Sequence, residues 1–477
     1  MPLRGVLVEQ ASRCDQRRTS VPLFAVRTAR VPRQPNPGRE ATDDELRRAD
    51  AHGYHPAQQR RSLDTTRTLV TSAWDLMADH PGRPLRAAEV LAATGVSSSS
   101  FYGRFESLHA LVEYAGLVAI SVEERRRAEP DRACGDAGPP EEVLGAATRE
   151  VFAPALVPGR MPREVLASGA WSEPYVDAYG RCRQLLIRDL AGRVVLAMPT
   201  DATGELEPAS ASYPRLLTWL HLICSAAHQL WAVGGAVLPA TYLSELADVA
   251  VHLGGHLFAP ADVSGPERPD ALDLPPPPTM RRRRVVPARS DRGERAAREL
   301  RDALHRELLR QGRELSPTEV TRSVHRSRTS FFDAFGTVGS ALADLARAEQ
   351  IGRVPTQVLR PRSDVGPDAV VAHVIGRLRA WQDHHGITGR RLLQAAPDHP
   401  ELAQEVLGQI LDSVELLTGW YAPAFTLPED HVRALFTLLI AAEQHQVVWG
   451  PQPVVVAGPR AVDALLGPVI RRPGAAG

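Results

Sequence analysis

The sequence predicts an all-α protein made of two similar halves, and three observations lead to this expectation. Apolar residues recur at spacings of three and four, as in Leu69, Ala73 and Leu76, which is the period of an amphipathic helix. Alternating strand patterns are absent from the sequence. Short segments of the first half return in the second half in the same order. The 477 residues leave room for about three domains, or for two large ones with linkers.

Composition limits the kinds of partner and compartment that fit the chain. The 56 basic side chains, all arginine, balance 56 acidic ones, so any nucleic-acid surface has to be a local patch. The apolar window from Leu216 to Leu238 contains two histidines and is expected to be a buried helix, with no membrane span. The cysteines form no CxxC pair and fit a reducing, cytoplasmic compartment: Cys14, Cys134, Cys182 and Cys224.

Two regions rich in proline and arginine interrupt the helical pattern. Residues 1–60 show no sustained periodicity and are expected to form a disordered tail. Residues 263–290 combine the prolines 275–278 with the arginines 281–284, which predicts an extended, semi-rigid linker.

Three helices are expected after the tail. The first covers residues 65–79 and the second Arg86–Ala93, each with one apolar face. A tight turn follows, in which Gly95 is free to adopt the left-handed backbone that most residues resist. Ser97 caps a third helix, whose buried side is formed by Phe101 and Phe105. The second and third helices, with the turn between them, have the pattern of a helix-turn-helix. Such a motif places the later of its two helices, here the one that Ser97 caps, in the major groove of DNA.

The stretch from Leu69 to Leu111 resembles, without a gap, the DNA-binding domain of the TetR family of bacterial transcriptional regulators. The residues that meet the family pattern are Gly95, Val96, Ser97, Phe101, Tyr102, Phe105 and Ser107. The resemblance implies a three-helix head in front of an all-helical domain that binds a small ligand and dimerises, with ligand binding releasing DNA.

The resemblance also implies which residues of this head contact DNA. Ser97–Arg104 would be the recognition helix, with the Tyr102 hydroxyl donating to a phosphate. Leu108 stands where family members usually carry a lysine, so one phosphate contact is missing, although Arg86 and Arg104 could partly substitute. The expected contacts are Arg86, Ser97, Ser98, Ser99, Tyr102 and Arg104. The alternative is an ordinary three-helix core that binds no DNA.

Three matches relate the second half to the first. Residues 97–105 (SSSSFYGRF) align with 327–335 (SRTSFFDAF) at an offset of 230. The region of Pro174 aligns with that of Pro400 at an offset of 226, and His228–Gln229 with His445–Gln446 at 217. Because the order is kept and the offsets fall slowly, duplication with small deletions is favoured.

The second copy of the head is degenerate. A first helix is expected over Gly293–Gln311 and a short second one near Pro317, but His325 replaces the turn glycine and Phe332 replaces Tyr102. A non-glycine residue in the left-handed region costs on the order of 1–2 kcal/mol. Residues 281–310 nevertheless hold 11 Arg against 5 Asp plus Glu. Either this head binds DNA with weak specificity or it is a retained structural domain. Its candidate contacts are Arg322, Arg326, Arg328 and Ser330.

Tryptophans and histidines recur in the regions that follow each head. They could line a ligand pocket between helices, or they could simply form the core. The candidates are Trp171, Trp219, His221, His228, Trp231, Trp381, His445 and Trp449, and Trp420 is a further aromatic of the same region. The pair His252 and His256 and the triplet 383–385 lack an identifiable third ligand, so no metal is expected.

The sequence therefore favours a sequence-specific DNA-binding regulator, a repressor that a small-molecule effector releases from a double-stranded operator. HExxH, GxSxG and phosphate-binding glycine loops are absent, so neither catalysis nor a cofactor is expected. The helices Leu216–Trp231 and Ala434–Trp449 are expected to pack together as an intrachain pseudo-dimer, with an ordinary homodimer as the alternative. From another functional class, a helical ligand-sensing or protein-interaction module would also fit.

The expected order of domains along the chain is tail (1–60), head (61–128), regulatory domain (129–262), linker (263–290), second head (291–350) and second regulatory domain (351–477).

Overall fold

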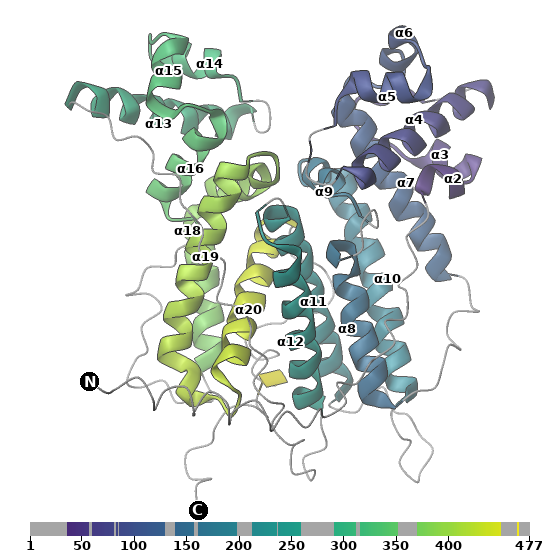
Figure 1. Cartoon of the computed structure of the whole chain (residues 1–477), viewed down its shortest axis with the longest axis vertical. Coiled ribbons are helices and arrows are strands. Elements are labelled where there is room, and N and C mark those ends of the chain that lie inside the picture. Colours follow the sequence, from purple (N-terminus) through teal and green to yellow (C-terminus); the bar gives the residue numbers. More distant parts are fainter. Residues whose placement is uncertain are drawn as a thin grey trace, which may run out of the picture. The chain divides into compact units, whose positions relative to one another are not determined.

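In the computed structural model, the described residues form a series of helices (Figure 1). Within the described residues the one isolated β-bridge pairs Tyr54 with Phe105. The all-α expectation is therefore confirmed. The described ranges are 36–56, 60–80, 83, 85–128, 139–156, 161–197, 212–235, 237–258, 291–311, 315–351, 370–449 and 465–466. The expected linker, 263–290, lies outside them.

The first head consists of α4 to α6, followed by the long helix α7. Its helices are amphipathic: Leu69, Ala73 and Met77 form a buried stripe on α4, as their spacing of four predicts. The helices of this part are α2 (Pro37–Glu40), α3 (Asp43–Arg48), α4 (Arg60–Asp79), α5 (Ala87–Thr94), α6 (Ser98–Tyr102) and α7 (Leu108–Ala128).

Residues 36–56 correct the expected disordered tail, because they are folded against the first head. Thr42 caps α3 through a reciprocal pair of hydrogen bonds with Glu45. Leu46 is fully buried, and its carbonyl accepts a hydrogen bond from the Tyr114 hydroxyl of α7. The carboxylate of Glu45 also pairs with Arg125. Two helices this short show too few turns for a hydrophobic period, which explains why the sequence pattern missed them.

The helices after the first head pack against one another, and α11 among them is largely buried. In the described part of the chain, its Arg215–Gly234 stretch is the one long and apolar enough to cross a membrane, but 89% of its apolar segment is buried inside the protein. The expectation of a buried helix is therefore confirmed. The helices are α8 (Pro140–Leu156), α9 (Arg163–Gly169), α10 (Glu173–Ala197), α11 (Ser212–Gly234) and α12 (Ala240–Phe258).

The second half begins with the second head, α13 to α15. Leu300, Leu304 and Leu308 are fully buried along α13, again at a spacing of four. Helix α18 contains a sharp break at Gly386, where φ is +48° and ψ is −127°. The elements are α13 (Asp291–Gln311), α14 (Pro317–Ser323), α15 (Arg328–Phe335), α16 (Val338–Glu349), α18 (Val370–Ala395), η3 (Ala396–Asp398), α19 (Pro400–Tyr421), η4 (Ala422–Ala424) and α20 (Glu429–Trp449).

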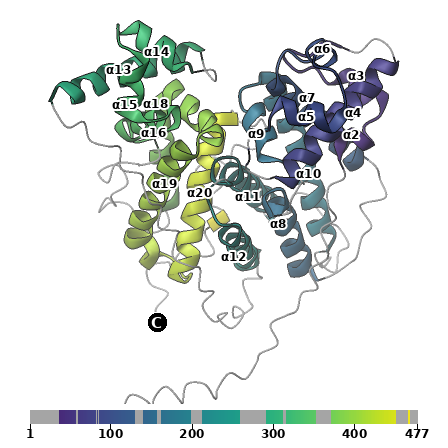
Figure 2. The same ribbon diagram turned by 45° about the horizontal axis from the view of Figure 1, so that its top comes forward.

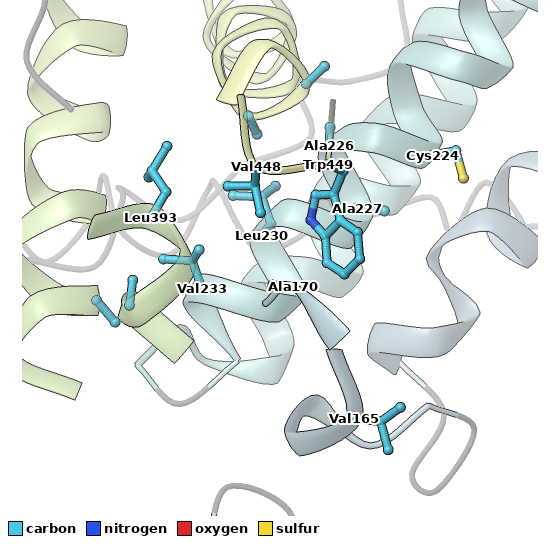
Figure 3. Packing of buried hydrophobic residues seen from close by; sticks show 14 of the residues in the cluster. Val165, Ala170, Cys224, Ala226, Ala227, Leu230, Val233, Leu393, Val448 and Trp449 are labelled. Carbon is cyan, nitrogen blue, oxygen red and sulfur yellow. The ribbon is translucent and has the colours of Figure 1, made fainter. Parts of the chain in front are cut away.

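Helices α11 and α20 lie side by side and join the two halves (Figures 1 and 2). Leu230 and Val233 of α11 pack in one buried cluster with Val448 and Trp449 of α20 and with Leu393 of α18 (Figure 3). The expected packing of these two apolar helices is therefore observed.

Candidate functional site

The turn between α5 and α6 has the geometry that its glycine predicts. Gly95 ends α5 with φ +67° and ψ +9°, a left-handed conformation that costs glycine little. Ser97 follows in extended conformation, and its hydroxyl caps α6 by accepting a hydrogen bond from the backbone N–H of Ser100 at 3.2 Å. Phe101 and Phe105 are both fully buried, as expected.

The side of α6 that faces away from this core is polar and accessible. Ser97, Ser98 and Ser99 are exposed, and Tyr102 exposes 52% of its surface. Arg86, at the start of α5, is also exposed. An exposed aromatic hydroxyl beside small hydroxyl side chains can donate to an anion without first breaking a contact inside the protein.

The expected recognition helix, Ser97–Arg104, is shorter in the structure. Helix α6 ends at Tyr102, where Gly103 is its C-cap, so Arg104 lies in the following turn. The carbonyl of Arg104 accepts a hydrogen bond from the backbone N–H of His55 at 2.7 Å, and the Arg104 side chain is half-buried. The folded segment 36–56 therefore determines where this arginine lies.

The second head repeats the turn with a strained residue. His325 occupies the position of Gly95 with φ +51°. Ser327 caps α15 by accepting from the N–H of Ser330 at 3.1 Å, as Ser97 does for α6. Phe331 and Phe335 form the buried side of α15.

The expected DNA contacts of the second head differ in how accessible they are. Arg322 and Arg328 are exposed, and the Arg328 guanidinium lies 5.4 Å from the centre of the Phe332 ring. Arg326 is bound to Glu299 of α13 at 2.7 Å, and the Ser330 hydroxyl lies 2.9 Å from that of Ser327. Three of the four candidates, all but Arg322, thus already have a partner inside the protein.

A buried polar network lies where α10, α11 and α20 meet. His228 Nδ1 lies 2.8 Å from His445 Nε2. Arg183 Nη1 donates to the Ser225 hydroxyl at 2.9 Å and lies 3.3 Å from His445 Nδ1. Arg183, His228 and His445 expose 4%, 7% and 0% of their surfaces. This network connects the two halves through buried polar atoms.

The donors and acceptors of this network follow from its arginine. A guanidinium only donates, so His445 Nδ1 accepts, and its proton is on Nε2, which donates to His228 Nδ1. The proton of His228 is then on Nε2, a buried atom without a hydrogen-bond partner among the described residues.

Burial and charge keep both histidines neutral. Burial lowers the pKa of His228 and of His445 well below the usual range, and the positive charge of Arg183 lowers both further. The same two causes lower the pKa of the neighbouring His221 on α11 to about 4.

Aromatic rings enclose the network. The rings of Tyr179 and Trp449 lie 4.4 Å and 4.5 Å from that of His228, and 5.1 Å from each other. The structure thus brings together His228, His445 and Trp449 from the expected ligand set, and Figure 3 shows Trp449 in the buried cluster beside α11.

The remaining candidates of that set lie elsewhere. Trp219 is fully buried in the core of the first half. Trp231 donates its indole N–H to the carbonyl of Met161 at 3.0 Å. Trp171 lies beneath the guanidinium of Arg391 at 5.2 Å, and Trp381 contacts the rings of His384 and His385. The half-buried Trp420 packs against the core.

Sequence reasoning missed Arg183, Ser225 and Tyr179. A usable signal was present, because Tyr175, Tyr179, Arg183 and Ile187 follow one another at intervals of four and so share the buried face of α10. An arginine on an apolar face is unusual enough to mark a polar partner across the helix interface.

Within the residues that the structure describes, no three His, Cys, Asp or Glu side chains gather in a way that could hold a metal ion. The rings of His252 and His431 lie 6.4 Å apart. Cys182 and Cys224 are free thiols, and burial raises the pKa of Cys182 to about 12.

No protein-family model matches the chain, and no curated protein shows significant similarity to it.

Proposed function

We propose that the chain is a sequence-specific DNA-binding transcriptional regulator of the TetR type, a repressor released by a small molecule. The observation that carries this proposal is the first head. A left-handed glycine turn leads into a short helix that buries Phe101 and Phe105 and leaves Ser98, Ser99 and Tyr102 accessible. Exposed hydroxyl groups on such a helix suit contacts with phosphates and base edges.

We propose further that the two halves act as a covalent pseudo-dimer. In a two-fold interface the same surface is used by both partners, so equivalent residues meet near the axis. His228 and His445, which align at an offset of 217, are hydrogen-bonded to each other.

A second pair of equivalent segments supports the same arrangement. The offset of 226 places residues 163–171 over 389–397. Arg163 donates to the carbonyl of Pro397 and Gln394 donates to the carbonyl of Ala170, each at 2.7 Å. Contacts between equivalent segments in both directions are what a pseudo-two-fold axis requires.

Gel-shift titration on DNA selected from random duplexes tests the proposal. Tyr102→Phe should weaken binding to all sequences about equally and leave the salt dependence unchanged, because no charge is lost. Arg104→Ala should cost about 1–3 kcal/mol of binding free energy at one position if this side chain reaches a base. Arg86→Ala should reduce the salt slope by roughly one if Arg86 contacts a phosphate.

The matched control is Arg188→Ala, which removes an exposed arginine from α10. It should leave DNA affinity and the salt slope unchanged. Equal effects of Arg188→Ala and Arg86→Ala, or wild-type affinity after replacement of Ser98, Ser99 and Tyr102, would contradict the assignment of this surface.

The alternative function, a helical ligand-sensing or protein-interaction module without specific DNA binding, draws on the second head. There Arg326 is paired with Glu299, and a phenylalanine stands in place of Tyr102. Such a module would associate with DNA weakly, with strong salt sensitivity and without a preferred sequence.

A further inference from the structure

Arg183 is a buried arginine without an acidic partner among the described residues. Both of its hydrogen bonds use Nη1, toward Ser225 and toward His445. Its Nε is buried and has no hydrogen-bond partner in the described part of the chain. A buried guanidinium is unfavourable unless a counter-charge and a full set of hydrogen bonds offset its lost hydration.

A second buried arginine shows how this protein otherwise compensates such a charge. Arg127 of α7 exposes 5% of its side chain and pairs with three carboxylates, those of Glu123, Glu150 and Asp189, at 2.7 to 3.2 Å. Arg183 has neutral partners only, a hydroxyl and an imidazole. The contrast marks Arg183 as a positive charge that the described chain does not balance.

The free edge of Arg183 has the geometry of an anion site. With Nη1 engaged, Nε and Nη2 form a planar fork of parallel N–H donors, which matches the two oxygens of a carboxylate. We propose that this edge binds the carboxylate of a small organic acid whose flat, apolar body lies against the aromatic rings of Tyr179 and Trp449. The centres of those rings lie 5.1 Å apart, and the two rings supply the apolar contact.

Binding of the organic acid at Arg183 would also affect the junction of the two halves. The same guanidinium contacts His445 of α20 through Nη1, so a carboxylate that draws the opposite edge of Arg183 toward itself changes the contact between α10 and α20. A ligand that prefers one arrangement of the halves shifts the equilibrium between them. This regulatory step rests on the proposed function, whereas the anion site itself does not.

Isothermal titration calorimetry of the full chain with sodium benzoate tests the site. Benzamide, a neutral analogue of similar shape, serves as the control ligand, and Arg188→Gln serves as the control variant because Arg188 is exposed on the same helix. Wild type and Arg188→Gln should bind one benzoate per chain, and benzamide should not bind. Arg183→Lys should weaken binding roughly tenfold, because lysine keeps the charge and loses the fork. Arg183→Gln should abolish binding.

Thermal unfolding identifies a variant that merely fails to fold. Arg183→Gln should melt no lower than wild type in benzoate-free buffer, since it removes an unbalanced buried charge. Benzoate should raise the midpoint of wild type and of Arg188→Gln, and it should leave that of Arg183→Gln unchanged. If Arg183→Gln does not fold, the difference between wild type and Arg183→Lys decides. Absence of saturable benzoate binding to wild type, or equal binding by wild type and the folded Arg183 variants, would overturn the anion site.

Gel shifts with and without benzoate separate the two proposals. Benzoate binding that depends on Arg183, together with unchanged DNA affinity, would overturn the regulatory step and retain the site. The same benzoate binding in a chain without specific DNA binding would contradict the proposed function alone.

Discussion

At the residue scale, the two heads differ at one turn position, which is Gly95 in the first head and His325 in the second. Both take a left-handed conformation, with φ of +67° and +51°. Glycine does so freely, whereas a residue with a Cβ is strained there by on the order of 1–2 kcal/mol. The left-handed turn could be predicted at Gly95 from the residue itself, and at His325 only through its alignment with the first head.

Replacing His325 by glycine should therefore stabilise the second head. We expect the free energy of local unfolding, measured by hydrogen exchange of α14 and α15 in the full chain, to rise by about 1 kcal/mol. Ala348→Gly is the control, because Ala348 is an exposed helical position of α16 where glycine should destabilise by about 0.5–1 kcal/mol. A loss of stability in His325→Gly would contradict the strain assigned to this turn.

Phe332 allows the two interpretations of the second head to be separated. It is exposed at the position equivalent to Tyr102, so Phe332→Tyr adds a hydroxyl without disturbing the core. If α15 lies against DNA, affinity should increase for all sequences by about 0.5–1.5 kcal/mol, the usual contribution of one hydrogen bond. Unchanged affinity in a gel-shift titration would favour a retained structural domain.

At the scale of single elements, sequence patterning succeeded where helices are long and amphipathic. The buried stripes of α4 and α13 follow a spacing of four, and both helices lie close to their expected ranges. The segment 36–56 escaped because α2 and α3 are too short to show a period. The pairing of Arg183 with His445 across 262 positions of sequence could not be predicted, since it depends on how α10 and α20 are both placed against α11.

The histidines buried at and near the contact between α11 and α20 should make the free energy of unfolding depend on pH. The pKa values of His221, His228 and His445 are lowered in the folded chain, first by burial and then by Arg183, so the unfolded chain binds more protons below the usual histidine pKa. The free energy of unfolding should therefore have its full value above about pH 6.5. It should fall as pH decreases, by up to about 1.4 kcal/mol per pH unit for each histidine.

Denaturant titrations at several pH values measure this dependence. The double variant His228→Gln and His445→Gln should lose most of the slope between about pH 6.5 and the lower limit of folding, and His221 should account for part of the remainder, down to its pKa of about 4. A slope unchanged by the double variant would show that these histidines do not carry the acid sensitivity.

At the scale of the whole molecule, the two halves meet through equivalent segments within one chain. In the proposed pseudo-dimer, the hydrogen bond between His228 and His445 and the contacts of 163–171 with 389–397 take the place of an interface between two chains. Because α20 already covers α11, the same face is not available to a second chain. Light scattering should therefore give a mass near 51.9 kDa, and a stable particle of twice that mass held by α11 and α20 between chains would contradict the pseudo-dimer.

Selection of bound fragments from random duplex DNA tests the central claim most directly, because it reports both heads at once. The first head has a relaxed glycine turn and Tyr102, whereas the second has a strained turn and Phe332. The predicted result is an asymmetric site, with one strongly specified half and a weakly specified half about one helical turn of DNA away. Recovery of no preferred sequence, or of a symmetric palindrome with two equally specified halves, would contradict the account.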